Sequence, residues 1–355
     1  MHAPERIDDL LTAAEPAPGV RPSERRPRGK GFVAALVAGA LVLVGASGAT
    51  AWFGYRISLD EKIERIDDPF AGLDEADRPA PAPQGAPAPV NILVLGSDSR
   101  ISAGDPSAWE FGAQRTDAIL LFHLSADRKS AAAISIPRDS WVPIPGYGEA
   151  KINAAFSYGG PALMIETVED LTGVRIDHFA VSDFESFTTL TDTLGGVEIT
   201  VPDGAGGSVV QEMTGQEALE FTRERYSLPN GDFGRVQRQQ AWMRAIVTQA
   251  TADKNDLPKL SRFLEVALRS VAVDENLTID TMLELAISAR DLSTGDMTFL
   301  TAPYAGTGRS ADGQSTVVLD RERFDPLMQA VAEDRLPGYL AESPDGIDML
   351  SDVVE

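Results

Sequence analysis

Residues 31–55 form a run of 25 residues without a charged side chain, and this run constrains where the rest of the chain can lie relative to a membrane. About 20 apolar residues are enough to cross a bilayer as a helix. Five basic residues between Arg21 and Lys30 precede the run, and basic flanks favour the cytoplasmic side. The sequence therefore predicts a cytoplasmic segment over 1–30, one transmembrane helix over 31–55, and a cell-membrane protein whose remaining residues are extracytoplasmic.

A cleaved secretory signal is the alternative interpretation of the same run. Residues 49–51 (Ala-Thr-Ala) resemble the small-residue pattern of a signal cleavage site. The apolar run continues past that point to Trp52, Phe53 and Tyr55, whose rings suit a membrane interface and favour an uncleaved anchor. Either interpretation places the large C-terminal part outside the membrane.

The charge of that C-terminal part excludes some functions. The whole chain carries −23, and residues 1–30 hold six basic and five acidic side chains, so −24 belongs to the rest. Such a surface disfavours nucleic acid, whose binding depends on cations at phosphate groups. The chain has no cysteine and three scattered histidines, so a metal would be bound through oxygen or nitrogen and a zinc site is not indicated.

Composition divides the exported part into three. Residues 56–89 hold six prolines, which is typical of an extended, semi-rigid linker. Residues 90–338 suffice for a single large domain. The acidic residues 339–355 are expected to form a mobile tail.

The order of apolar runs and turn residues in 90–338 predicts an α/β fold. Residues 90–95 form a continuous apolar run, as in a strand buried on both faces. Mixed strands and helices in this order indicate a three-layer α–β–α domain with a central mixed sheet. We expect strands over 90–95, 118–124, 130–136, 175–182 and 196–201, and helices over 160–172, from the Thr214 capping box to 221, and over 234–252.

A cluster of arginines stands out in this acidic chain. Arg223, Arg225, Arg235 and Arg238 lie within 16 residues, and such groups repel one another unless an anion lies between them. Arg223 and Arg225 would share a face if extended, while Arg235, Arg238 and Gln239 share one face of a helix. We interpret the cluster as a phosphate or pyrophosphate site, which arginine binds bidentately. A solvated charged helix face is the alternative.

Acidic residues lie where the predicted strands end. Asp98 follows one strand, Asp117 begins the next, and Arg138 with Asp139 ends a third. Ligands bind at strand ends in open α/β sheets. Two carboxylates beside several arginines indicate a hard divalent cation, Mg²⁺ or otherwise Mn²⁺, that bridges an anionic substrate. A turn or helix cap is the alternative role of each aspartate.

Several short segments, each weakly specific alone, form a specific set when taken in order. They are LGSDSR (95–100), RTD (115–117), ISIPRD (134–139), KINAAF with the following GG (151–160), LGGV (194–197), RER (223–225) and DFGRVQRQQ (232–240). Together they resemble the LytR–CpsA–Psr family of wall-polymer ligases over about residues 91–250. A membrane anchor, a linker and an outside domain also fit that family.

The resemblance implies a phosphoryl transfer. A glycopolymer on a polyprenyl pyrophosphate would pass to the C6 hydroxyl of muramic acid in peptidoglycan, forming a phosphodiester and releasing polyprenyl phosphate. Arginines and a metal can stabilise the charge of such a reaction without a covalent nucleophile. The resemblance assigns Mg²⁺ to Asp98 and Asp117, and orientation or deprotonation of the hydroxyl to Asp232, with Arg138 and Arg225 as further catalytic residues. The pyrophosphate would contact Arg100, Arg115, Arg138, Lys151, Arg223, Arg225, Arg235, Arg238 and Gln239.

Two other functions stay open on the sequence. A hydrolase would cleave the lipid-linked pyrophosphate with water in the same pocket and would share nearly all these residues. A non-catalytic, membrane-anchored lipid-binding regulator would not need the complete set of aspartates and arginines. A prenyl chain would also need an apolar tunnel, which we expect between the sheet and its covering helices. The glycopolymer is not identified, because arabinogalactan, teichoic-acid-like and capsular polymers would share the pyrophosphate.

Overall fold

The computed structural model describes residues 59–60, 62–83, 85, 87–97, 116–224, 228, 231–252, 257–343 and 345–355. The predicted cytoplasmic segment and transmembrane helix, residues 1–55, lie outside this part of the chain. Within it, every helix is too short or too polar to cross a membrane.

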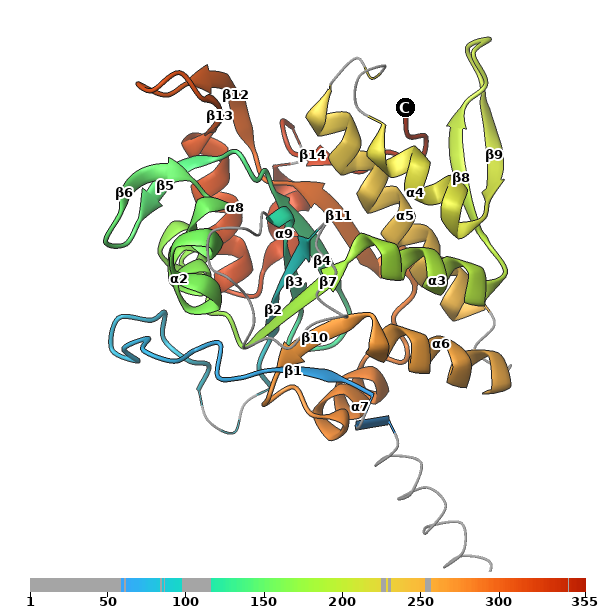
Figure 1. Ribbon diagram of the computed structural model, residues 1–355, viewed down its shortest axis with the longest axis horizontal. Coiled ribbons are helices and arrows are strands. Elements are labelled where there is room, and N and C mark those ends of the chain that lie inside the picture. Colours follow the sequence, from blue (N-terminus) through green and yellow to red (C-terminus); the bar gives the residue numbers. More distant parts are fainter. Residues whose placement is uncertain are drawn as a thin grey trace, which may run out of the picture. The chain divides into compact units, whose positions relative to one another are not determined.

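A mixed sheet of eight strands forms the centre of the domain (Figure 1). Its three middle strands, β2, β3 and β4, are antiparallel neighbours, whereas β7 and β11 run parallel to β2 and β4. Across the sheet the order is β1 (Glu64–Ile66), β10 (Val271–Asp274), β7 (His178–Asp183), β2 (Val90–Ser97), β3 (Thr116–Leu124), β4 (Ala131–Ile136), β11 (Met297–Thr301) and β14 (Asp348–Met349).

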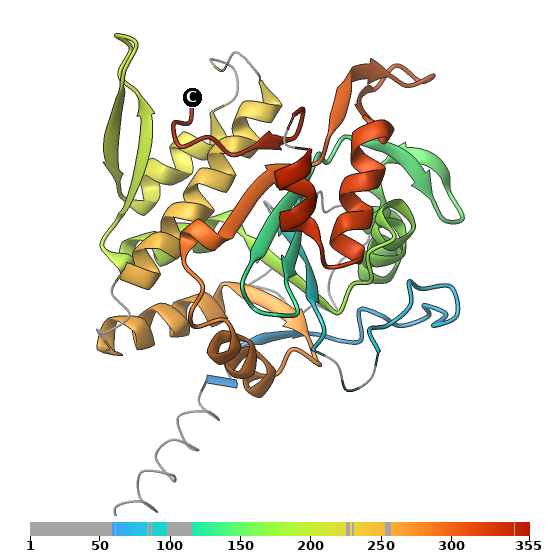
Figure 2. The same cartoon turned by 180° about the vertical axis from the view of Figure 1, so that it is seen from behind.

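Helices cover both faces of this sheet, as Figures 1 and 2 show, which confirms the predicted α/β class with a central mixed sheet. On one face lie α2 (Ala154–Thr172), α8 (Arg321–Ala332) and α9 (Leu336–Glu342). On the other lie α3 (Phe184–Leu194), α4 (Gly215–Arg223), α5 (Asp232–Ala252) and α6 (Leu257–Arg269), and α7 (Ile279–Ser288) follows β10. Three hairpins complete the described chain: β5 (Trp141–Ile144) with β6 (Gly148–Lys151), β8 (Val197–Pro202) with β9 (Ser208–Met213), and β12 (Tyr304–Arg309) with β13 (Ser315–Leu319).

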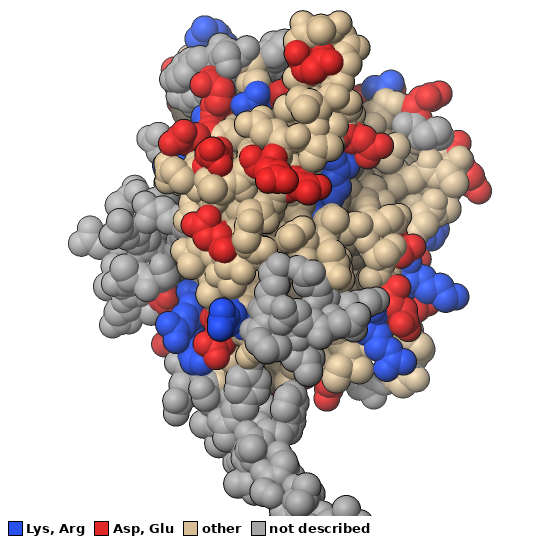
Figure 3. Space-filling model, turned by 90° about the vertical axis from the view of Figure 1, so that its right-hand side faces the viewer, with Lys and Arg blue, Asp and Glu red and all other residues tan. Residues whose placement is uncertain are grey.

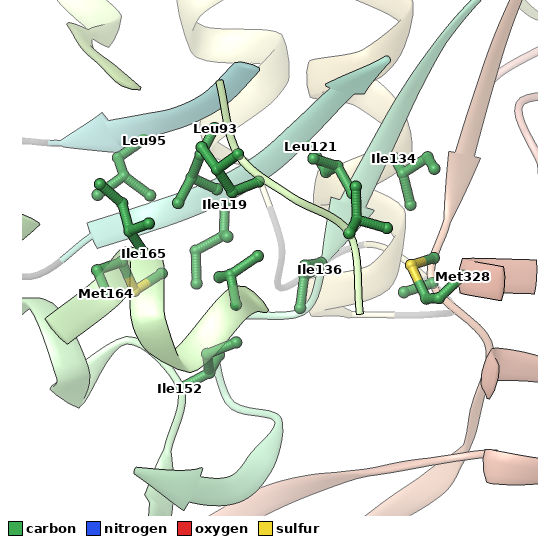
Figure 4. Close-up of a cluster of buried hydrophobic side chains, with 14 of the residues drawn as sticks. Leu93, Leu95, Ile119, Leu121, Ile134, Ile136, Ile152, Met164, Ile165 and Met328 are labelled. Atoms are coloured by element: carbon green, nitrogen blue, oxygen red, sulfur yellow. The ribbon is translucent and has the colours of Figure 1, made fainter. Parts of the chain in front are cut away.

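The two faces of β2 and β3 are buried to different degrees, whereas β4 is buried on both faces. Leu93, Leu121 and Ile134 are fully buried and pack with Met164 and Ile165 of α2 in the main core (Figure 4). The alternate side chains of β2 and β3, which point toward α5, are only half-buried. The strand predicted over 90–95 is therefore in the middle of the sheet, but the side chains on its α5 face are only partly buried.

Several predicted elements are present with shifted limits. Thr214 begins α4 with the expected capping box, in which the Thr214 N–H donates to the Glu217 carboxylate at 2.8 Å. Helix α4, predicted to about residue 221, continues to Arg223, so the extended conformation that would place Arg223 and Arg225 on one face is not adopted at Arg223, and Glu224 is the first extended position. The strand predicted over 196–201 is β8, which pairs with β9 rather than with the central sheet.

The described part of the predicted linker packs on the domain. Strand β1 pairs with β10, and Phe70 and Leu73 pack against the main core. Arg78 donates to both carboxylate oxygens of Glu169 on α2, at 3.0 and 2.8 Å, and these hydrogen bonds raise the pKa of Arg78. The prediction of an extended spacer over 56–89 is therefore wrong for residues 64–78. The prediction fails because these contacts join residues that are far apart in the sequence. Most of the prolines on which it depends lie after residue 78.

The acidic C-terminal segment is docked as well. Strand β14 pairs with β11, and Val354 is 2% exposed within a second core formed with α4 and α5. Arg244 of α5 donates to the Ser351 carbonyl at 3.0 Å and pairs with Asp352 at 3.5 Å. The prediction of a mobile tail over 339–355 is wrong for residues 339–342, which lie in α9, and for residues 345–355, because an apolar side chain reaches the core and a basic side chain of α5 binds the acidic chain.

Candidate functional site

Two arginines and one aspartate meet where β4 ends and α5 begins. Asp232 Oδ1 lies 2.9 Å from Arg235 Nη2 and 3.8 Å from Arg138 Nη2. The two arginine side chains are 11% and 19% exposed, while Asp232 is 40% exposed. Two guanidinium groups thus share one carboxylate, and guanidinium groups in such a position can bind an anion bidentately.

Helix α5 is fixed against the sheet by buried polar side chains. The amide of Gln240, fully buried, donates to Ser135 Oγ at 2.8 Å and to the Leu300 carbonyl at 2.9 Å. The indole N–H of Trp242 donates to Thr191 Oγ1 at 2.8 Å. Asp232 lies eight residues before Gln240, about 12 Å along the helix. These bonds therefore set the position of Asp232 over the end of β4.

A largely apolar cavity extends from this group between the sheet and α5, with about 690 Å³ of empty space including the solvent at its mouth. Its sheet side is formed by alternate residues such as Val94, Ala118 and Leu120, which explains their partial burial. Its helix side is formed by Val236, Trp242 and Met243. Arg138, Asp232 and Gln239 provide polar groups where α5 begins. The cavity lies where the sequence predicts an apolar tunnel.

The backbone of β2 and β3 brings together the neighbours of the two predicted metal ligands. Ser97 pairs with Thr116 and Gly96 with Ala118, so Asp117 lies at a β-bulge. Bulges are frequent beside active sites, where they redirect a side chain. Asp98 and the side chain of Asp117 lie outside the described residues. Among the side chains that are described, no group of three or more His, Asp or Glu could hold a metal.

The other predicted site residues are placed differently. Lys151 pairs with Asp139 at 2.9 Å, one residue after Arg138. Arg223 is exposed at the end of α4. The guanidinium of Arg238 lies 4.2 Å from the Phe221 ring centroid and donates to the Phe221 and Glu355 carbonyls, and its pKa is lowered by burial. The structure therefore does not bring Arg238 into the group around Asp232. Arg100, Arg115 and Arg225 lie outside the described residues.

Sequence reasoning missed the residues that position the site and line the cavity. The motifs include Gln240 only as one position of a segment, and they do not include Trp242, which is buried, or Met243, which is half-buried. The signal available in the sequence is a glutamine that lies between apolar residues on one face of a helix. A buried amide requires hydrogen-bond partners on the element that packs against that face. Figure 3 shows acidic side chains spread over one face of the domain with isolated basic groups between them. On that face the charge pattern agrees with the exclusion of nucleic acid.

Comparisons with known sequences match most of the chain. The LytR_cpsA_psr family matches residues 72–333. The cell wall biosynthesis protein LcpA of Corynebacterium glutamicum is 29% identical over 294 residues, which is 70% of this chain and 56% of LcpA. The probable cell wall biosynthesis protein LcpB of that organism is 33% identical, over 75% of this chain and 63% of LcpB. The polyisoprenyl-teichoic acid–peptidoglycan teichoic acid transferase TagU of Bacillus cereus is 34% identical, over 57% of this chain and 65% of TagU.

The chain thus spans between 56% and 65% of the length of these relatives. Solved structures share its fold. TagV of B. subtilis superposes with a TM-score of 0.57 at 25% identity, over 70% of this chain and 98% of TagV. TagT bound to LI-WTA superposes with a TM-score of 0.53 at 25% identity, over 70% of this chain and 90% of TagT.

Proposed function

The chain belongs to the LytR_cpsA_psr family, and on that premise we propose that it transfers a glycopolymer from a polyprenyl pyrophosphate to peptidoglycan. One observation carries the proposal: an apolar cavity is lined at one end by Arg138 and Asp232, and Asp232 also pairs with Arg235. The apolar lining of the cavity suits a prenyl chain, and the arginines suit its pyrophosphate. The name of TagU specifies peptidoglycan as acceptor and teichoic acid as cargo for that relative. The anchor over 31–55 would keep this enzyme at the membrane that holds its lipid substrate.

The proposed chemistry is an in-line phosphoryl transfer. The C6 hydroxyl oxygen of muramic acid forms a bond to the phosphorus that carries the glycopolymer. The bond from that phosphorus to the bridging oxygen breaks, and polyprenyl phosphate leaves with the electron pair. Arg138 and Arg235 donate to the phosphate oxygens, over which the charge of the transition state is spread. Both arginines contact Oδ1 of Asp232, and we assign Oδ2 to accept the hydroxyl proton.

We propose that a divalent cation binds at the same end of the sheet. The pairing of Ser97 with Thr116 and the bulge at Asp117 would let the carboxylates of Asp98 and Asp117 approach one ion. Carboxylates with phosphate oxygens and water are the ligands that Mg²⁺ prefers. When bound, Mg²⁺ would neutralise charge on the pyrophosphate.

We expect Val94→Trp to raise the KM for a long-chain polyprenyl donor about tenfold, because an oversized side chain in a packed site costs ~1–3 kcal/mol. The side chain of Val94 lines the cavity. The measurement is transfer by the full chain from a lipid-linked glycopolymer to peptidoglycan. Val94→Ala, which enlarges the cavity, is the matched control and should keep the wild-type KM.

The same assay separates the proposed transfer from the alternatives. Glycopolymer bound to peptidoglycan through a phosphodiester supports the ligase. Free glycopolymer phosphate formed in the presence of acceptor would indicate a hydrolase instead, and turnover of neither kind would indicate a binding protein. An unchanged KM in Val94→Trp would mean that the cavity does not bind the prenyl chain of the donor.

Asp98→Asn or Asp117→Asn should raise the Mg²⁺ concentration needed for half-maximal transfer by more than about tenfold. Asparagine has the size of aspartate but lacks the negative charge of a Mg²⁺ ligand. Calorimetric titration of Mg²⁺ into the full chain gives a second readout that does not depend on turnover. Asp139→Asn is the control, because Asp139 pairs with Lys151. Wild-type Mg²⁺ dependence in both site variants would contradict the metal assignment.

A further inference from the structure

The β5–β6 hairpin and the start of α2 carry exposed aromatic rings that the proposed transfer does not yet use. Tyr147 is 57% exposed and Tyr158 is 46% exposed. Their rings stack with centroids 4.8 Å apart, and the Tyr147 hydroxyl donates to the Tyr158 carbonyl at 3.3 Å. Trp141, half-buried on the same hairpin, donates its indole N–H to Glu149 at 3.2 Å. We call Trp141, Tyr147 and Tyr158 the aromatic platform.

The aromatic platform begins near the reacting end of the cavity with Trp141 and extends to Tyr147 in the hairpin turn, beyond the pair of Ile144 and Gly148. Trp141 follows Arg138 by three residues, at most about 10 Å of extended chain. Opposite Trp141 on β6 is Lys151, which pairs with Asp139 at 2.9 Å. Val142 and Ile144 turn into the core, so the alternate residues Trp141 and Pro143 face outward. The hairpin therefore forms a continuous outer surface that begins beside Arg138.

The aromatic platform and the cavity belong to opposite sides of the sheet. Helix α2, which carries Tyr158, packs on the face of Leu93 and Leu121, whereas the cavity lies on the α5 face, beside Val94 and Ala118. The two sides meet at Arg138, where β4 ends. In phosphoryl transfer the attacking and leaving oxygens lie roughly in line across the phosphorus. If prenyl phosphate leaves into the cavity, the acceptor approaches from the platform side.

A sugar ring matches the chemistry of this surface. One face of a pyranose presents C–H groups, which pack on an aromatic ring because the ring face is apolar and carries negative charge. Glu149 and Lys151, the nearest charged residues on the hairpin, offer hydrogen-bonding groups to hydroxyls. Exposed apolar surface arranged in this way marks an interaction site.

We propose that the aromatic platform binds the glycan strand of the acceptor, the strand that carries the reacting hydroxyl. The acceptor assignment rests on the proposed transfer to peptidoglycan, whereas binding of a sugar to the platform does not. Stacking on the two tyrosines would hold the strand while one of its muramic acid residues lies at Asp232.

The test uses the full chain and a soluble, peptide-free glycan fragment of alternating N-acetylglucosamine and N-acetylmuramic acid. The double variant Tyr147→Ala/Tyr158→Ala should bind this fragment about tenfold more weakly by calorimetry, because each stacked ring is removed. In the transfer assay its KM for the glycan acceptor should rise by a similar factor, with no rise in the KM for the lipid-linked donor. Tyr147→Phe/Tyr158→Phe keeps both rings and should restore fragment binding.

Val209→Ala/Val210→Ala is the matched control, because both side chains are about half exposed on β9, outside the aromatic platform. Wild-type fragment affinity in the double alanine variant would overturn the proposal. A raised KM for the donor instead of the acceptor would overturn the acceptor assignment, since the platform would then bind the donor glycan. If the wild type transfers nothing but the alanine variant still loses fragment binding, the transfer function fails and the sugar site stands.

Discussion

Arg138→Ala is expected to lower the kcat/KM for glycopolymer transfer by about 10²–10³, equivalent to ~2.7–4 kcal/mol. Arg138 is 19% exposed at the end of β4 and lies 3.8 Å from Asp232. A donor held this way needs little reorganisation as charge develops on the phosphate, so its loss falls mainly on the transition state. The measurement is steady-state transfer by the purified full chain from a lipid-linked donor.

Substitution by lysine tests whether geometry or charge matters at this position. Lysine keeps the positive charge but loses the planar fork that binds two phosphate oxygens. Arg138→Lys should therefore be more active than Arg138→Ala and less active than the wild type. Arg244→Ala is the matched control, because Arg244 pairs with Asp352 near the C-terminus and should leave the rate almost unchanged. If Arg138→Ala and Arg244→Ala are equally active, Arg138 does not contact the reacting phosphate.

Arg78→Ala should lower the free energy of unfolding by about 3–5 kcal/mol, the usual cost of removing one partner from a buried ion pair. Glu169 is 3% exposed and would be left without the two hydrogen bonds from Arg78, although the Ile176 N–H still donates to it at 2.8 Å. Urea unfolding of the full chain, followed by a probe of the α/β domain, measures the difference.

Two further variants interpret that result. Arg175→Ala removes a surface pair whose partner, Glu75, is 62% exposed, and should cost only about 0–1 kcal/mol. Arg78→Met/Glu169→Leu removes both buried charges and should recover most of the loss, because apolar side chains can replace a buried pair without penalty. Equal costs for Arg78→Ala and Arg175→Ala would mean that residues 64–78 do not pack against α2 in solution.

The elements around the site could be predicted from sequence because their signals are local. The apolar runs of β2, β3 and β4, the capping box at Thr214 and the arginine-rich start of α5 each lie within a few residues of the structure they determine. Docking of residues 64–78 and 345–355 could not be predicted in the same way. Arg78 finds Glu169 across 91 positions, and Arg238 reaches Glu355 across 117. Proline content and acidity predict the conformation of such segments only when the segments do not pack against the rest of the chain.

The group at Asp232 was predictable in composition but not in arrangement. Motifs name Arg138, Asp232 and Arg235, yet their common position depends on the Gln240 bonds that set α5 over β4. Arg238 lies in the same motif and turns instead toward Phe221 and the C-terminal segment. Spacing along a helix gives the direction of a side chain, whereas its partner depends on what packs beside that face.

The central sheet has a very short strand at each edge, and these two strands affect the tendency of the chain to aggregate while it folds. Strand β1 has three residues and β14 has two, and they cover β10 and β11. An uncovered edge offers unpaired backbone groups to another chain and invites aggregation. Because β14 lies almost 50 residues after β11 in the sequence, that edge stays open until late in synthesis. Loss of either short strand would therefore favour self-association over reversible unfolding.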